Sequence, residues 1–154
     1  MIVKKNRINI VIGADHRGFL HKEYLKQHLI LDNCSITWHD VGAKNSERSD
    51  YPVYAKQVVE IMRAEGPAEL GIMICGSGIG MAIVANRYSG IYAAVAWNTA
   101  VARFAAEHDK VNVLSIPADF VSQEEMVLIV HAWLAADFLG GRYQKRIDMI
   151  DKIE

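Results

Sequence analysis

The sequence predicts an α/β fold with three layers: a doubly wound, Rossmann-like sheet of five parallel strands covered by helices on both faces. Apolar runs of strand length alternate along the chain with segments of helical periodicity. Parallel neighbours need a crossover, and the intervening helices supply it. The chain has 154 residues, of which 51% are hydrophobic, so it is long enough for one such domain and too short for two.

The first half of the chain contains strands predicted at residues 8–12, 36–41 and 70–75 and helices predicted at residues 19–31 and 52–64. The first strand stops at the loop GADHRG, and the second leads into the polar loop GAKNSERSDY. The proline after that loop suits the first turn of a helix. The third strand, LGIMIC, is apolar throughout, as expected for a central strand with both faces covered.

The second half continues the alternation, with a helix to about residue 87, a strand at 91–96, a helix at 98–107 and a strand at 113–116. A Ser-x-x-Glu capping box then opens a long helix that we expect to stop at Gly140-Gly141. Its apolar stripe comprises Met126, Ile129, Val130, Trp133, Leu134 and Phe138. A last helix, 142–152, has too little apolar surface to be core, so we expect it on a neighbouring subunit or along the rim.

The end of the third strand carries the most informative pattern. Cys75 is followed by glycines at positions 76, 78 and 80 and then by a helical pattern. A Gly-rich turn that opens a helix exposes backbone N–H groups at the helix's positive end, which stabilises negative charge and favours a thiolate. The pattern indicates chemistry on an anionic substrate or intermediate, although a buried structural thiol is the commoner role of a strand-end cysteine.

Other polar residues follow the carboxyl ends of the remaining strands: Asp15-His16, the loop that ends in Tyr51, and Trp97-Asn98. In sheets of this class ligands bind outside the carboxyl ends of the strands, so we expect these residues to converge at one edge. A purely structural alternative is that Asp15-His16 caps the following helix.

Polar residues on the later helices also have two interpretations. His108 suits the negative end of its predicted helix, and His131 is expected to pack within the apolar long helix. Arg142 and Arg146 are four residues apart, so both guanidinium groups lie on one side of the last helix. They form either a solvated face or a forked contact for phosphate.

Composition and spacing disfavour several classes of protein. A formal net charge of −1 gives no support for bulk nucleic-acid binding. The glycine spacing does not fit a dinucleotide fingerprint, no Gly-Lys-Ser/Thr sequence is present, and the histidines lack metal-ligand spacing. The two cysteines form no disulfide framework, and no apolar run fits a signal peptide or membrane span. We therefore expect a cytoplasmic protein without a metal, a cofactor, a nucleic-acid partner or a membrane partner.

The segments GADHRG, SERSDYP, ICGSGIGMAIVANR, EHDKVNVL and GGRYQKRID occur in this order. In these motifs the chain resembles the type B ribose-5-phosphate isomerases, whose wider family also contains galactose-6-phosphate and allose-6-phosphate isomerases. The resemblance covers nearly the whole chain, and SERSDYP and CGSGIG are its specific segments. It implies one sugar-phosphate isomerase domain over residues 1–154, which interconverts ribose 5-phosphate and ribulose 5-phosphate in the pentose phosphate pathway without metal or cofactor.

The resemblance also implies a role for each candidate residue. Cys75 is the base that takes the proton from C2 to give a cis-enediolate, where some members use a glutamate at the position of Met81. His108 opens the sugar ring by general acid–base transfer, and Asp15 binds sugar hydroxyls. Ser77 and the amides of Gly76, Gly78, Ile79 and Gly80 form an oxyanion hole. The phosphate is bound by His16, Arg142 and Arg146, and the sugar is contacted by Tyr51 and Asp109.

A homodimer, or a dimer of dimers, is implied as well, with the site shared between subunits. His108, Arg142 and Arg146 then come from the partner chain, which accounts for the weakly apolar last helix.

Three positions depart from the family pattern. Asp109 stands where the family usually has asparagine, Asp119 where it usually has an arginine that contacts phosphate, and Tyr143 where a histidine is often found. Two alternatives therefore stay open. One is an isomerase of another sugar, either a six-carbon aldose 6-phosphate or an unphosphorylated sugar. The other is a non-catalytic sugar-phosphate-binding subunit of a hetero-oligomer, whose partner restores the missing arginine.

Overall fold

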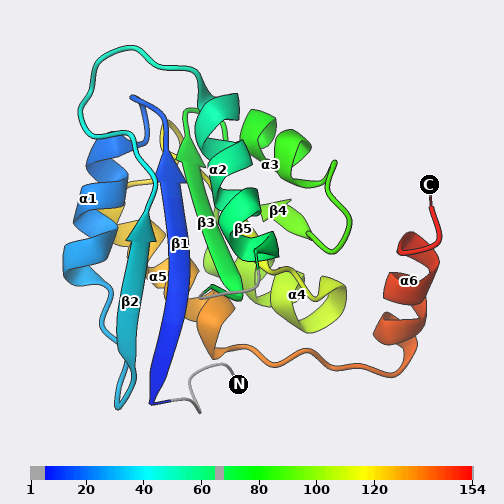
Figure 1. Cartoon of the computed structure of the whole chain (residues 1–154). Helices are drawn as coiled ribbons and strands as arrows, with labels where there is room; N and C mark the ends of the chain where they lie inside the picture. The colour runs from blue at the N-terminus through cyan, green and yellow to red at the C-terminus, as the bar shows by residue number, and fades with distance from the viewer. Residues whose placement is uncertain (1–5, 65–67, 154) are drawn as a thin grey trace.

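The computed structural model describes residues 6–64 and 68–153, which contain a sheet of five parallel strands in the order β2-β1-β3-β5-β4 (Figure 1). The predicted fold class is confirmed. The strands are β1 (Arg7–Ala14), β2 (Ser35–Asp40), β3 (Leu70–Cys75), β4 (Ala93–Val95) and β5 (Val113–Pro117). The helices are α1 (Phe19–His28), α2 (Tyr51–Arg63), α3 (Ile79–Ala85), α4 (Thr99–Asp109), α5 (Gln123–Ala135) and α6 (Arg142–Ile150).

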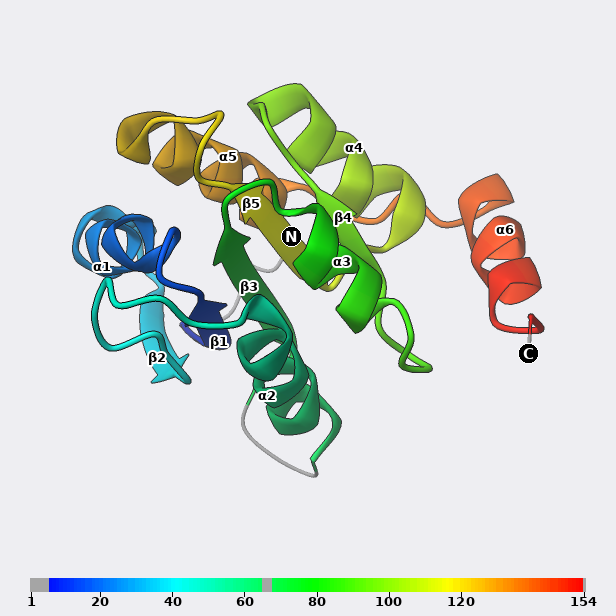
Figure 2. The same ribbon diagram turned by 90° about the horizontal axis from the view of Figure 1, so that it is seen from above.

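Helices cover both faces of the sheet and give it the three predicted layers. α1, α4 and α5 lie on one face, and α2 and α3 lie on the other (Figure 2). In the first layer Trp133 is fully buried and donates its indole N–H to the carbonyl of Val111 at 3.0 Å. The core under α2 and α3 includes Val58, Met73 and Cys75. α6 lies at the outside of the molecule, beside α4 (Figures 1 and 2).

The chain winds outward from β1 in both directions, with β2 on one side and β3 on the other. Such a divergence creates a crevice at the carboxyl ends of the central strands, where ligands bind in this class of sheet. Ala14 of β1 is paired with Ile74 of β3, and the amide of Asp15 donates to the carbonyl of Ile74 at 3.2 Å. The register therefore places Asp15 and Cys75 side by side at this crevice.

The long helix α5 is shorter than predicted. It ends at Ala135, well before the paired glycines, and Phe138 belongs to the irregular segment 136–140 rather than to the helical stripe. The amide of Leu139 donates to the carbonyl of Glu107 at 3.0 Å. This segment is thus held against the end of α4, and that tertiary contact replaces a further turn of helix.

The strand predicted at residues 91–96 is also shorter, because β4 has three residues. Side-chain amides take over its first hydrogen bonds. The Asn112 Oδ1 atom accepts from the amide of Tyr92 at 2.9 Å, and the Asn86 Oδ1 atom accepts from the amide of Ala93 at 2.8 Å. β4 lies at the edge of the sheet, where such side chains have room to approach the backbone.

The other helix ends differ by a few residues, and one packing prediction is wrong. α1 ends at His28 rather than at residue 31, and α3 ends at Ala85 rather than at residue 87. His131 is exposed on α5, where the apolar residues of the stripe fill the buried face and leave the histidine on the outer one.

Candidate active site

The glycine loop, residues 76–80, forms the turn from β3 into α3. All six residues of β3 are buried, so the core fixes the strand end that precedes the loop. Gly78 has a φ of 72°, in the left-handed region where glycine is favoured. Its carbonyl accepts a hydrogen bond from the hydroxyl of Ser115, a fully buried residue of β5, at 2.6 Å. The neighbouring strand therefore holds the loop in place.

Cys75 ends β3 with its sulfur facing the glycine loop. Burial, which leaves the residue 3% exposed, and the nearby carboxylate of Asp15 both raise the pKa of the thiol. The amides of Ser77, Gly78 and Met81 donate toward the sulfur and oppose this effect, but the pKa remains above its ordinary value. The loop amides therefore act in the predicted direction, but burial and the charge of Asp15 outweigh them in the single chain.

The predicted oxyanion donors are not equivalent. The amide of Gly78 faces the sulfur of Cys75, and the amide of Ile79 donates to the Ser77 hydroxyl at 3.4 Å. Gly76 is buried, and Gly80 is partly buried. The loop thus brings a thiol, a hydroxyl and a row of main-chain donors together, and their role toward an oxyanion stays a prediction.

Asp15 combines the two roles considered for it. Its Oδ1 atom accepts hydrogen bonds from the amides of Arg17 at 2.9 Å and of Gly18 at 3.1 Å, so it caps the turn before α1. The carboxylate is 5% exposed, and its charge also acts on Cys75. It is therefore placed beside the candidate base while the loop amides satisfy one of its oxygens.

His16, in the loop after β1, and Tyr51, at the end of the loop after β2, lie at the same edge of the sheet. The amide of His16 donates to the Ser49 hydroxyl at 3.1 Å, and the amide of Ser49 donates to the Nδ1 atom of His16 at 3.2 Å. Tyr51 begins α2, and its ring lies against Gly80, where an added Cβ would be 2.5 Å from the Cζ atom of the tyrosine. The glycine at position 80 therefore makes room for the aromatic ring.

A second cluster of predicted site residues lies on α4 and α6. The rings of His108 and Tyr143 are stacked, with centroids 4.3 Å apart and planes 3° from parallel. The guanidinium groups of Arg142 and Arg146 lie 4.9 and 5.6 Å from the centroid of the same tyrosine ring. The Arg142 Nη2 atom also donates to the Tyr143 hydroxyl at 2.9 Å. This arrangement presents two guanidinium groups beside an imidazole.

The two clusters lie at opposite edges of the sheet within one chain. α4 begins after β4, where the Asn98 side chain caps it by accepting from the amide of Val101 at 2.9 Å, and it ends shortly before β5 begins. Eleven helical residues span about 16 Å, so α4 carries His108 away from the carboxyl edge. Trp97 and Asn98 do lie at that edge, but β5 separates β4 from β3.

The comparisons with known proteins identify the family of the chain. Residues 10–150 match the family model described as Ribose/Galactose Isomerase. The chain belongs to this family. Ribose-5-phosphate isomerase B of Escherichia coli K12 is 40% identical to this isomerase over 145 residues, which cover 94% of this chain and 95% of that protein.

Solved structures of ribose/galactose isomerase family members share the fold. The ribose 5-phosphate isomerase of Thermotoga maritima has a TM-score of 0.87 and 38% identity, covering 95% of this chain and 99% of that one. The ribose-5-phosphate isomerase B of Mycoplasma genitalium, solved with bound ribulose-5-phosphate, has a TM-score of 0.85 and 36% identity, covering 94% of this chain and 95% of that one.

Two residues of this family member that the sequence did not single out lie at the glycine loop. One is Ser115, described above. The other is Arg17, whose guanidinium forms an ion pair with Asp119 beside the loop. The available signal for Arg17 was a basic residue within the loop GADHRG. Nothing in the local pattern of β5 distinguishes Ser115 from any other small strand residue.

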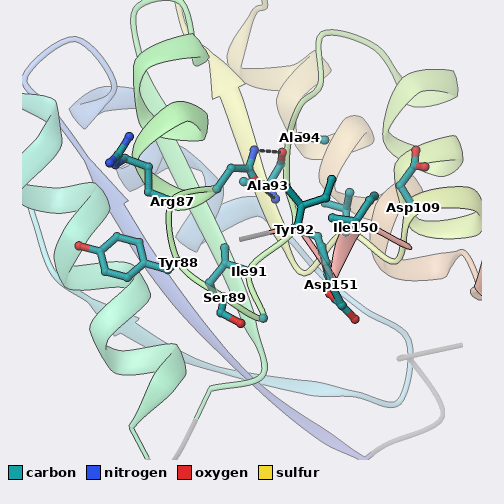
Figure 3. Close-up of a pocket in the computed structure, with 14 residues that line it drawn as sticks. Arg87, Tyr88, Ser89, Ile91, Tyr92, Ala93, Ala94, Asp109, Ile150 and Asp151 are labelled. Carbon is teal, nitrogen blue, oxygen red and sulfur yellow. Dashed lines mark hydrogen bonds between the residues drawn. The ribbon is translucent and has the colours of Figure 1, made fainter. Parts of the chain in front are cut away.

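A cavity of about 930 Å³ lies between β4, the end of α4 and the C-terminal helix of this isomerase (Figure 3). Asp109, Tyr92, Ile150 and Asp151 are among its lining residues, and Cys75 is not. Tyr92 donates its hydroxyl to Asp151, and this hydrogen bond raises the pKa of Tyr92 to about 12. The phenol therefore stays protonated and ties the end of the chain to the sheet edge.

Within residues 6–64 and 68–153, no group of three or more His, Cys, Asp and Glu side chains is placed to hold a metal ion. In the same part of the chain, no helix has both the length and the apolar character needed to cross a membrane.

Proposed function

We propose that this family member interconverts ribose 5-phosphate and ribulose 5-phosphate, with Cys75 as the base. The observation that carries the proposal is the position of the Cys75 sulfur, against main-chain amides at the carboxyl edge of β3 and beside Asp15. The Mycoplasma genitalium relative, 36% identical and solved with ribulose-5-phosphate, supports this choice of substrate.

The proposed reaction moves one proton between neighbouring carbons. The deprotonated sulfur of Cys75 takes the proton from C2 of the open-chain aldose. The electron pair of that C–H bond forms the C1–C2 double bond, and the C1 carbonyl oxygen becomes the enediolate oxyanion. Donors of the glycine loop and the Ser77 hydroxyl stabilise this charge. Cys75 then returns the proton to C1, and the proton of the C2 hydroxyl is transferred to the C1 oxyanion, so that a C1 hydroxyl and a C2 carbonyl form and the product is the ketose.

The raised pKa of Cys75 fits the role of a base toward carbon. A thiolate with a higher pKa is a stronger base, and burial keeps water away from the developing charge. The cost is a smaller thiolate fraction at neutral pH. We therefore expect kcat/KM to rise with pH until the thiol is deprotonated. Because the pKa of Cys75 is raised, the midpoint of this rise is expected above the ordinary pKa range of cysteine.

We also propose that two subunits build each site. His108, Asp109, Arg142 and Arg146 lie toward the other edge of their own sheet, on α4 and α6. A second copy that brings this cluster to the glycine loop supplies the ring-opening acid and base, His108, and two cations for the phosphate. The separation of the clusters within one chain supports a homodimer or a dimer of dimers.

A second candidate function keeps the chemistry and changes the sugar. Asp109 is exposed at the end of α4 beside His108, where it places a negative charge near the proposed sugar site. A six-carbon aldose 6-phosphate has an additional hydroxyl for that carboxylate to bind. Comparison of kcat/KM for ribose 5-phosphate with that for allose 6-phosphate and galactose 6-phosphate distinguishes the two candidates.

The proposal is tested by an isomerase assay on Cys75→Ala. Loss of a general base is expected to reduce kcat by about 100-fold to 10,000-fold. Cys34→Ala is a matched control, because Cys34 is also a buried free cysteine but is part of the core on the other face of the sheet. Its kcat is expected to stay near that of the wild type. An unchanged kcat in a folded Cys75→Ala protein would overturn the assignment of the base.

A further inference from the structure

The ion pair between Arg17 and Asp119 occupies one side of the glycine loop, next to Cys75. We propose that Arg17 binds the phosphate group of the substrate and that Asp119 is a positioning residue that orients it. This inference rests on the proposed function, because it assigns the phosphate end of the same site.

Arg17 lies in contact with the first residue of the loop. A Cβ added at Gly76 would be 2.7 Å from the Cζ atom of Arg17 and 2.8 Å from its Nε and Nη1 atoms. The guanidinium therefore rests on the backbone of Gly76, directly after Cys75. The backbone amide of Arg17 is held by Asp15, so the residue starts from a fixed turn.

Asp119 is fixed to the same loop by its backbone. Its amide donates to the carbonyl of Gly76 at 3.0 Å, and the preceding amide, of Ala118, donates to the carbonyl of Cys75 at 2.9 Å. Its carboxylate accepts from the Nη2 atom of Arg17. The two side chains thus meet over one short stretch of backbone, which limits the orientations that the guanidinium can adopt.

Part of the guanidinium remains available for an anion. Within residues 6–64 and 68–153, Asp119 is the hydrogen-bond partner found for the side chain of Arg17, through Nη2, and no partner is found for Nε and Nη1. The side chain of Arg17 is 56% exposed, whereas that of Asp119 is 33% exposed. A phosphate that approaches this edge therefore meets the cation before the carboxylate, and guanidinium donors match phosphate oxygens in a forked contact.

The charges at positions 17 and 119 together leave a cation for phosphate despite the departure at position 119. By the resemblance described above, position 119 usually carries an arginine that contacts phosphate. A lone carboxylate there would repel a phosphate dianion. Arg17 neutralises that carboxylate and returns a guanidinium to the same edge from the loop after β1. The guanidinium that the family usually supplies from the β5 side of the glycine loop is supplied here from the β1 side, by Arg17.

An alternative reading of the pair is a surface salt bridge without a ligand. Pairs between exposed side chains contribute little to stability. If the pair binds no ligand, neutralising Arg17 or Asp119 leaves both the fold and substrate binding unchanged. A phosphate ligand predicts instead that Arg17→Gln acts on KM. Hydrogen bonds to charged groups correspond to about 10-fold to 100-fold in affinity.

The experiment measures KM and kcat for ribose 5-phosphate in the wild type, Arg17→Gln, Asp119→Asn and the exchange Arg17→Asp/Asp119→Arg. Arg63→Gln is the matched control, since Arg63 is exposed at the far end of α2. Arg17→Gln is expected to raise KM by about 10-fold or more with kcat within about 3-fold, and Asp119→Asn is expected to raise KM less. The exchange is expected to recover most of the loss.

Two further measurements separate this inference from the proposed function. With unphosphorylated ribose, kcat/KM is expected to be the same for Arg17→Gln and the wild type. Binding of inorganic phosphate, followed by ³¹P line broadening, requires no turnover and is expected to weaken about 10-fold in Arg17→Gln. Phosphate binding or KM equal to the wild type in that variant overturns the role of Arg17, whether or not the protein isomerises ribose 5-phosphate. A wild type that binds phosphate but has no activity overturns the proposed function alone.

Discussion

At the scale of single residues, burial and the neighbouring carboxylate of Asp15 together raise the pKa of the Cys75 thiol. The carboxylate is nearly buried, and its charge is one of the two causes that raise the pKa of Cys75. One side chain therefore shapes the turn before α1 and tunes the candidate base. These two effects are separable, because an asparagine at position 15 keeps a carbonyl oxygen as hydrogen-bond acceptor and loses the charge.

Asp15→Asn is expected to lower the pKa of Cys75. The negative charge of the carboxylate disfavours the thiolate, so its removal favours the thiolate, while the amides of Arg17 and Gly18 still find an acceptor. The midpoint of the rate of iodoacetamide alkylation against pH is therefore expected to move to lower pH. The rates are measured between about pH 6 and about pH 10 in a Cys34→Ala background, which leaves one reactive cysteine. A midpoint that stays or moves upward contradicts the coupling.

The sequence identified the residues at the glycine loop better than it identified their partners. Cys75 and the alternate glycines are contiguous, so their geometry follows from a strand, a turn and a helix. Ser115 and Arg17 act across the fold, from β5 and from the loop after β1. Local patterns do not contain such long-range contacts, and the protonation of Cys75 depended on burial that the sequence did not specify.

At the scale of elements, α1 and β2 are joined by a charged network. Asp40, at the end of β2, accepts hydrogen bonds from the Nζ atoms of Lys22, which is 2% exposed, and Lys26, and from the amide of Gly42. Burial acts to raise the pKa of Asp40, but these contacts outweigh it and hold the pKa below its ordinary value. Folding therefore stabilises the ionised carboxylate.

This depressed pKa makes a testable contribution to acid stability. The stabilisation is present above the unfolded-state pKa of about 3.9 and is lost as the pH falls through the lower folded-state pKa. The free energy of unfolding is expected to decrease below about pH 4, and Asp40→Asn is expected to reduce that decrease. Urea unfolding at neutral and acidic pH measures it. Glu60→Gln is the control, because Glu60 pairs with Lys56 on the exposed surface of α2. Equal acid sensitivity in Asp40→Asn and the wild type would contradict the assignment.

The element boundaries show where sequence periodicity stops being informative. The buried strand β3 matches its predicted range, because both of its faces are apolar. α5 and β4 ended early, and in each case a contact made elsewhere was the cause: the Leu139 amide bound at the end of α4, and the side chains of Asn86 and Asn112 bound at the start of β4. Capping by distant groups leaves no periodic signal.

At the scale of the whole molecule, the two clusters of site residues lie at opposite edges of the sheet within one chain. Cys75 is at the carboxyl edge of the sheet, while His108 stacks on Tyr143 beside α6. The fold class predicted the position of Cys75. The position of the His108 cluster depends on α6, which the sequence marked as weakly apolar but could not place against α4.

A site shared by two subunits predicts complementation between inactive variants. Cys75→Ala and His108→Ala each lack one half of the site, but a mixed dimer contains one site in which both halves are intact. Co-expression with random pairing is expected to restore about a quarter of the wild-type activity. Co-expression of Cys75→Ala with a Cys75→Ala/His108→Ala chain is the control and is expected to restore none. Absence of recovery in the first mixture contradicts a shared site.

The contact between Arg17 and Asp119 joins positions 102 residues apart in the chain. Reversal of either charge alone would set two like charges over the same stretch of backbone, whereas reversal of both preserves the pair. During divergence from a common ancestor these two positions are therefore expected to change together, so that the acid and the base trade places across lineages while the sum of their charges stays constant.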